Sequence, residues 1–166
     1  MLLGAAVAVG FAGIACSAMI YVATGRPWWN AAETFSRFGA TTAVAAFGTL
    51  TTTATIDAGQ QPLAIGAAIA VAAVVGARLL HESQVFASDD PDETRTARLL
   101  RTVLASTYQQ RRFLSVAGAG FALLGAVVAA ATLVVVGLAL LAIGETWERR
   151  LFFAACAPRT MPGGLR

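Results

Sequence analysis

Four long runs without charged side chains set the first limit on how this chain can fold. They cover residues 2–25, 38–56, 58–77 and 113–144. A helix rises about 1.5 Å per residue, so each run is long enough to cross the roughly 30 Å apolar core of a bilayer. We therefore predict an all-α integral membrane protein with four transmembrane helices, at residues 2–23, 38–56, 60–78 and 115–143.

The last and the first of these runs each allow a second interpretation. The last is 32 residues long, more than one crossing needs, but no turn signal divides it into two halves. We expect one tilted or overhanging helix there. The first run lacks a basic segment before it, and Gly13 stands where a lipoprotein signal has leucine. We expect a permanent helix rather than a cleaved signal.

Composition supports a membrane protein and argues against several kinds of site. Hydrophobic residues make up 57% of the chain and charged residues 13%, against about 45–50% and 25% in soluble domains. Little sequence is left for a water-exposed enzyme domain, so we treat residues 1–166 as a single membrane domain. Twelve arginines against nine acidic residues do not indicate nucleic-acid binding.

Cysteine and histidine are too scarce for most metal chemistry. Cys16 and Cys156 form no CxxC pair, and His81 is the single histidine. The sequence therefore predicts no disulfide framework, no zinc or iron–sulfur site and no bis-histidine haem within this chain.

The distribution of arginine predicts how the four helices are oriented, because cytoplasmic loops carry an excess of basic residues. Residues 26–37 include two arginines and residues 78–112 six, whereas the N-terminus and residues 57–61 have none. The tail at residues 145–166 has four. Eight against four places the two arginine-bearing loops in the cytoplasm and both termini outside. The expected location is the cytoplasmic (inner) membrane, with several passes.

One substantial polar segment, at residues 79–112, interrupts the apolar runs. An acidic stretch at residues 89–93 suits a solvated turn, and apolar side chains of residues 94–110 fall on one helical face. Arg95, Arg98 and Arg101 lie on the remainder of that helix. A basic amphipathic helix beside a membrane either rests on anionic headgroups or docks a partner, and both interpretations stay open. These three arginines are candidate partner-docking residues.

Aromatic and basic residues gather where the first helix is expected to leave the membrane. Tyr21 is followed by Arg26-Pro27-Trp28-Trp29. Arginine and tryptophan at this depth are typical of the interfacial belt that anchors a helix. The functional interpretation is that Tyr21, Arg26 and the two tryptophans line a quinone-headgroup pocket. They would supply a hydrogen-bond donor to a carbonyl and a surface for the ring.

His81 and Glu82 follow the third predicted helix near the same interface. An acid and an imidazole can take the protons that quinol oxidation releases, so both are candidate quinol-binding residues. The alternative is an interfacial polar pair with no chemistry. A metal site at His81 is not expected, because no second ligand cluster accompanies it.

The fourth predicted helix carries signals for packing and for pairing. Gly118, Gly120 and Gly125 would let helix backbones approach closely. Glu145 and Arg149 are spaced for a surface ion pair on one helix face.

Ordered motifs near both ends of the chain carry a resemblance to a known family. They are Cys16-Ser17-Ala18-Met19-Ile20-Tyr21, Thr24-Gly25-Arg26-Pro27-Trp28-Trp29, Thr34-Phe35-Ser36-Arg37-Phe38, and Glu148-Arg149-Arg150-Leu151-Phe152-Phe153 with Pro158 and Met161-Pro162. Together with the polar loop at residues 79–112, they resemble the latter half of the dimethyl sulfoxide reductase membrane-anchor subunit family. The match spans nearly the whole chain.

The resemblance implies a role in anaerobic respiration and electron transport. Anchors of this family hold an iron–sulfur subunit and a molybdopterin catalytic subunit at the membrane, and they oxidise menaquinol without carrying haem. By this resemblance the chain is a non-catalytic anchor subunit of a molybdopterin oxidoreductase complex. It has no cofactor of its own, menaquinol is the substrate, and molybdopterin and iron–sulfur clusters belong to the partner subunits.

The chain departs from the family pattern in length. Family anchors have eight helices, and this sequence corresponds to the last four. The family histidine associated with quinol oxidation lies in the first half, so it is not assigned to His81. Three explanations stay open: a shortened anchor, a second chain that supplies four further helices, or an internal start at Met1.

Two other classes of function compete with an anchor. Transporters usually place an acid or base inside a span, and the four apolar runs contain none. A small four-helix transporter, or a structural membrane protein without a redox role, is the alternative. An independent enzyme is disfavoured, because no Ser/His/Asp, Cys/His or paired-carboxylate arrangement lies near a pocket-forming segment.

Overall fold

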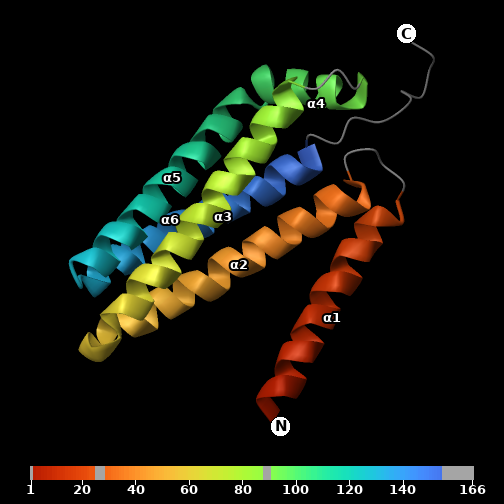
Figure 1. Ribbon diagram of the computed structural model, residues 1–166. Coiled ribbons are helices and arrows are strands. Elements are labelled where there is room, and N and C mark those ends of the chain that lie inside the picture. The colour runs from red at the N-terminus through yellow and green to blue at the C-terminus, as the bar shows by residue number, and fades with distance from the viewer. Residues whose placement is uncertain (1, 25–28, 88–90, 155–166) are drawn as a thin grey trace.

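The computed structural model describes residues 2–24, 29–87 and 91–154. Within these ranges the chain is all-helical, which confirms the all-α part of the predicted fold class. The elements are α1 (Leu2–Val22), α2 (Ala31–Ile56), the short 3-10 helix η2 (Ala58–Gln60), α3 (Gln61–Ala87), α4 (Pro91–Arg101), α5 (Ala105–Val127) and α6 (Ala131–Ala154) (Figure 1).

Helices α2, α3, α5 and α6 form an antiparallel bundle (Figure 1). Its core uses small and β-branched side chains such as Val71, Ala122 and Val134, all fully buried. The C-terminal end of α1 contacts α2, and Ala18 is fully buried there. Toward its N-terminus, α1 diverges from the bundle (Figure 1). α4 lies against α3 and α5 at one end of the bundle.

The long run at residues 113–144 forms parts of two helices, so the prediction of a single tilted helix is wrong. α5 and α6 pack antiparallel and are joined by a turn in which Ala129 has a φ of 53°, the left-handed region where glycine is usual. The Ala130 N–H donates to the Gly125 carbonyl at 2.8 Å and closes the end of α5. Because alanine stands in the position that glycine usually takes, the sequence carries no turn signal here.

Glycines let α5 and α6 approach closely. A side chain on Gly118 would lie 2.8 Å from the Gly137 carbonyl, and one on Gly125 would lie 2.7 Å from the Val134 backbone nitrogen. The predicted interface positions of Gly118 and Gly125 are thus confirmed. Gly120 faces open space, so its predicted position in an interface is wrong. The free energy gained by this close packing offsets the roughly 1–2 kcal/mol that the left-handed backbone conformation of Ala129 costs.

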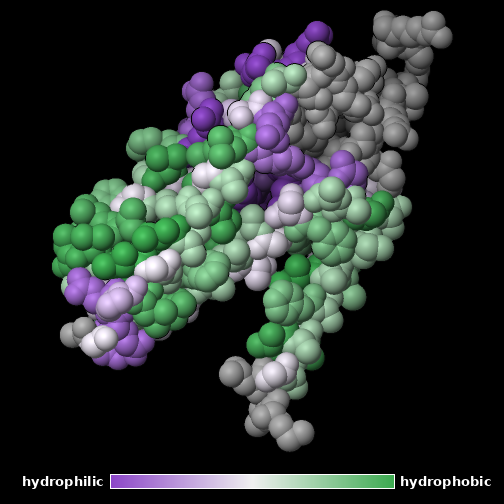
Figure 2. Space-filling view, viewed as in Figure 1, coloured by the Kyte–Doolittle hydropathy of each residue, from purple (hydrophilic) through white to green (hydrophobic). Residues whose placement is uncertain are grey.

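The hairpin brings most of the described charged residues to one end of the bundle, hereafter the polar end. Here α2 begins, α3 ends, α5 begins and α6 ends (Figure 1). Figure 2 shows hydrophilic surface gathered there and apolar surface along the body. Arg149 and Arg150 of α6 lie at this end together with Arg37, Arg78 and Arg111. The predicted separation of the two α6 arginines from the others is therefore wrong.

Three helices extend past the apolar runs into the polar end. The Asn30 side chain caps α2 by accepting a hydrogen bond from the Glu33 N–H at 2.8 Å, so α2 begins well before residue 38. α3 continues past Arg78, and α6 continues past Glu148. The single amphipathic helix predicted at residues 94–110 is instead divided between α4 and α5 by a turn at residues 102–104.

Two segments are long and apolar enough to cross a membrane, Gln61–Gln84 in α3 and Ala131–Ala154 in α6. They indicate a membrane-associated protein, and the four crossings predicted from the sequence are not confirmed. α1 begins far from the polar end, whereas α6 ends at it (Figure 1). The expectation that both termini share one side rests on an even number of crossings, and the α5–α6 hairpin removes that basis.

Candidate functional site

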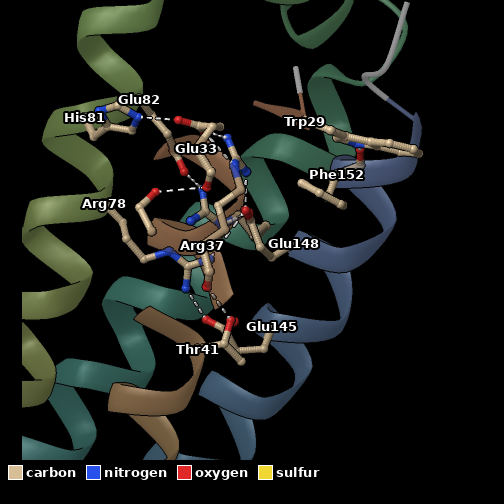
Figure 3. A network of polar contacts seen from close by, with 12 residues as sticks. Trp29, Glu33, Arg37, Thr41, Arg78, His81, Glu82, Glu145, Glu148 and Phe152 are labelled. Atoms are coloured by element: carbon tan, nitrogen blue, oxygen red, sulfur yellow. Dashed lines mark hydrogen bonds and ion pairs between the residues drawn. The ribbon is translucent and has the colours of Figure 1, made fainter. Parts of the chain in front are cut away.

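Eight ionisable side chains from four helices meet at the polar end. Figure 3 labels all of them except Arg111. This charged cluster consists of Glu33 and Arg37 of α2, Arg78, His81 and Glu82 of α3, Arg111 of α5, and Glu145 and Glu148 of α6. Each residue lies just outside an apolar run, and the antiparallel arrangement brings these positions to one depth.

Glu148 lies at the centre of the charged cluster and is 3% exposed. Its Oε2 is ion-paired with Arg111 Nε at 3.0 Å, and its Oε1 is 3.4 Å from Arg78 Nη2. Arg37 also donates to Oε1. A buried carboxylate is costly unless opposite charges and hydrogen bonds surround it. Three guanidiniums meet that condition, so Glu148 joins α6 to the other three helices of the bundle.

Each of the other carboxylates has a guanidinium partner. Glu33 accepts from Arg37 Nε at 2.6 Å, Glu82 pairs with Arg111, and Glu145 pairs with Arg78. The Thr41 hydroxyl donates to the second oxygen of Glu145 at 2.6 Å. Because most of these contacts cross between helices, the cluster fixes how the helices meet at the polar end.

His81 adds an imidazole at the edge of the charged cluster. Its Nε2 lies 2.6 Å from Glu33 Oε2, and its side chain is 50% exposed. Among the described residues of the charged cluster, four carboxylates face three guanidiniums. Glu33 and His81 thus form a hydrogen-bonded pair at the open edge of the cluster.

A cavity of about 580 Å³ lies beside the charged cluster, between α2 and α3. Its walls are Asn30, Ala32, Glu33, Ser36, Arg37, Ala40, Ala77, Arg78, His81, Glu82 and Glu148. Sites for small ligands usually measure roughly 300–1,000 Å³ and combine apolar walls with a few placed polar groups. Alanine methyl groups on both helices and a row of charged groups give this cavity that character.

The structure places His81 and Glu82 on the wall of the cavity but gives them different partners. Glu82 is 8% exposed and pairs with the buried guanidinium of Arg111. His81 points toward Glu33 across the cavity edge (Figure 3). Of the two, His81 is the one that solvent reaches.

Tyr21 and Trp29 come together, but in an aromatic cluster rather than on the described cavity wall. Trp29 stacks on Phe152 with ring centroids 5.5 Å apart, and its Nε1 donates to the Phe152 carbonyl at 3.2 Å (Figure 3). The Tyr21 ring lies 5.3 Å from that of Trp29. This packing joins α1 to the ends of α2 and α6, as an anchoring role requires. Arg26 and Trp28 lie outside the described residues.

The candidate docking residues Arg98 and Arg101 are exposed on α4. The side chain of Arg95 lies outside what the structure describes, although its backbone is part of α4. α4 packs inward through Ala97 and Leu100, which are 6% and 7% exposed. The two described arginines are therefore available at the surface of the polar end.

Most of the charged cluster carries no local sequence signal. Glu145 is spaced to pair with Arg149 on the same helix, yet it pairs with Arg78 of α3, so that prediction is wrong. The Arg149 guanidinium lies 4.0 Å from the centre of the Phe38 ring instead. What the sequence does show is the position of these residues, because all members of the charged cluster lie within about two helical turns of an apolar run.

Among the residues that the structure describes, no group of three or more His, Cys, Asp or Glu could hold a metal ion. No protein-family model, curated protein or solved structure matches the chain. The resemblance to the dimethyl sulfoxide reductase anchor family therefore stays a prediction.

Proposed function

We propose that the chain is a membrane-anchor subunit of a molybdopterin oxidoreductase of the dimethyl sulfoxide reductase type. In this proposal menaquinol is oxidised at the cavity between α2 and α3. The iron–sulfur and molybdopterin subunits dock at the polar end. The motifs that resemble the family support the anchor role, and the cavity supports the chemistry. The anchor acts alone as a half-length chain or beside a chain that supplies four further helices.

The observation that carries the proposal is the Glu33–His81 pair on the wall of a cavity at the edge of an apolar bundle. Oxidation of a quinol to a quinone releases two protons and two electrons. The Glu33 carboxylate accepts a hydrogen bond from a quinol hydroxyl, and the half-exposed His81 passes each proton in turn to water. The electrons leave to an iron–sulfur cluster of the partner subunit, which is the oxidant.

Other residues of the cavity suit the remaining parts of a quinol. Arg37 and Arg78 bring positive charge to the wall, which stabilises the anion left when the first proton departs. Ala40 and Ala77 supply apolar surface for the ring. Because carboxylates hold both guanidiniums in place, little reorganisation accompanies the loss of the proton.

Binding of a short-chain naphthoquinol to the purified chain in mild detergent tests the cavity. We expect the variant His81→Gln to bind about tenfold more weakly, since a hydrogen bond within a charged pair is lost. The matched control is Ser83→Ala, an exposed position of α3 that is not on the described cavity wall. Equal binding by the two variants, or no binding by the wild-type chain, would contradict the proposal.

A proton-coupled transporter is a second candidate, favoured by one observation. Glu145 and Glu148 lie in α6 within a segment long and apolar enough to cross a membrane. Acidic groups at such positions are typical of ion-coupled transporters. Proton-driven uptake of a solute by proteoliposomes that contain this chain alone would favour a transporter, and its absence favours the anchor.

A further inference from the structure

A second cavity lies at the polar end, between the end of α3 and α4, and the proposed function makes no use of it. It measures about 330 Å³. Its walls are Phe86, Thr94, Ala97, Arg98, Arg101 and Thr102. Leu100, on the buried side of α4, packs against Leu151 of α6 and is flanked by Phe86 and Tyr108. This α3–α4 cleft therefore has walls held in place by the bundle.

Two guanidiniums line the cleft from one side of α4. Arg98 and Arg101 are three residues apart, so they share a helix face. Arg101 Cζ lies 4.9 Å from the centre of the Phe86 ring, and Arg101 Nη2 donates to the Phe86 carbonyl at 3.5 Å. Neither arginine is ion-paired with any side chain that the structure describes. Two guanidiniums at one cleft without a described carboxylate partner attract an anion.

Arg98 and Arg101 differ in this respect from the three arginines of the charged cluster. Arg37, Arg78 and Arg111 are each ion-paired with one or more carboxylates. In the cleft the ring of Phe86 orients the Arg101 guanidinium, and no described carboxylate neutralises its charge.

The depth of the cleft identifies the source of the anion. The uncharged run of α3 ends at Ala77, nine residues or roughly 14 Å before Phe86, so the cleft lies in the polar end beyond the apolar body of the bundle. Val103, next to Thr102 of the cleft wall, is 78% exposed and suits contact with acyl chains. Guanidiniums bind phosphate through paired N–H donors, and basic pockets at this depth bind anionic headgroups.

We propose that the α3–α4 cleft binds the phosphate of an anionic glycerophospholipid through Arg98 and Arg101. The bound headgroup neutralises both guanidiniums and fills the space between the two helices, so lipid binding also holds α4 against the membrane surface. A zwitterionic lipid carries a positive group on the same headgroup and binds less tightly. This site does not depend on a redox role for the chain.

Native mass spectrometry of the full chain in mild detergent tests the site. The chain is titrated separately with short-chain phosphatidylglycerol, with phosphatidylcholine and with inorganic phosphate. We expect the wild type to bind phosphatidylglycerol about tenfold more tightly than phosphatidylcholine, because the two guanidiniums repel the choline cation. The double variant Arg98→Gln, Arg101→Gln loses that preference. The control Arg150→Gln, an exposed arginine of α6, keeps it.

Three results would overturn the assignment. A double variant that keeps the preference shows that the lipid binds elsewhere. Inorganic phosphate that competes as strongly as the lipid shows a site for free phosphate. If the double variant binds lipid like the wild type but no longer co-purifies with a soluble subunit, α4 docks a protein. If circular dichroism shows that the double variant misfolds, the single variant Arg98→Gln at an exposed side chain decides the same question.

Discussion

At the scale of single residues, Glu148 explains why four helices meet as they do. Its carboxylate is buried, and it is ion-paired with Arg37, Arg78 and Arg111 from three other helices. In an apolar bundle this arrangement directs association, because a misplaced helix would leave a charge without its partner. The same residue forms part of the cavity wall, so the group that organises the bundle also shapes the candidate site.

Glu148→Gln is predicted to destabilise the protein strongly. The amide keeps the shape of the side chain but removes the charge that three guanidiniums face, and breaking a buried ion pair costs about 3–5 kcal/mol. Thermal unfolding in detergent, followed by circular dichroism, measures the effect. The control is Thr146→Ala on α6, where the exposed hydroxyl donates only to the Ile143 carbonyl of its own helix. Equal stability of the two variants would contradict the central role of Glu148.

Residue-level prediction from the sequence reaches only part of this site. His81 and Glu82 are recognisable because a lone histidine beside an acid is unusual in so apolar a chain. Glu145 is not, because its spacing to Arg149 favours a local pair worth only a few tenths of a kcal/mol. The partner that it takes, Arg78, lies 67 residues away. Residue spacing within one helix cannot show that Glu145 pairs with a residue so far away in the sequence.

At the scale of elements, the α5–α6 hairpin decides the architecture. Apolar run lengths predict helices correctly, but they do not locate a turn inside a run. Helix ends are usually recognised by glycine, and Ala129 carries no such mark. The glycines that matter, Gly118, Gly125 and Gly137, lie within the helices and let the two pack closely. The turn is thus specified by tertiary packing, which is why the sequence alone suggests one long helix.

A distance measurement between spin labels tests the hairpin. The labels are attached at Phe113→Cys in α5 and Ile143→Cys in α6, both exposed, with Cys16 and Cys156 replaced by serine. One continuous helix would separate these positions by roughly 45 Å. Packed helix axes lie about 8–10 Å apart, so the hairpin predicts labels within about 20 Å of each other.

A second label pair provides the reference for that measurement. Leu63→Cys and Ser83→Cys lie on α3, a continuous helix, and are predicted to be roughly 30 Å apart. A distance between the α5 and α6 labels that exceeds this reference distance would show that residues 113–144 form one helix.

At the scale of the whole molecule, positive charge is concentrated at one end of the bundle. The arginines of the described helices lie at the polar end, and the opposite end carries Asp57 and glutamines but no basic residue among those described. Basic residues favour the cytoplasmic side of a membrane. We therefore expect the polar end to face the cytoplasm, which is where soluble partner subunits and the acidic headgroups of the inner leaflet would meet it.

Labelling of single cysteines with a membrane-impermeant thiol reagent tests this orientation. In the cysteine-free background, Asp57→Cys is predicted to react in intact cells, and Arg150→Cys only after the membrane is opened. The reason is that α3, α5 and α6 run antiparallel one after another between the two positions, which places Asp57 and Arg150 at opposite ends of the bundle. Labelling of both positions from the same side would contradict the hairpin and the orientation together.

Affinity purification of the tagged chain from native membranes, with mass spectrometry and metal analysis of the eluate, tests the anchor role most directly. We expect molybdenum, iron and two soluble subunits in stoichiometric amounts, with reduction of the iron–sulfur clusters on addition of menaquinol. A chain that purifies without metal and without soluble subunits would contradict the anchor role, whatever the cavity between α2 and α3 binds.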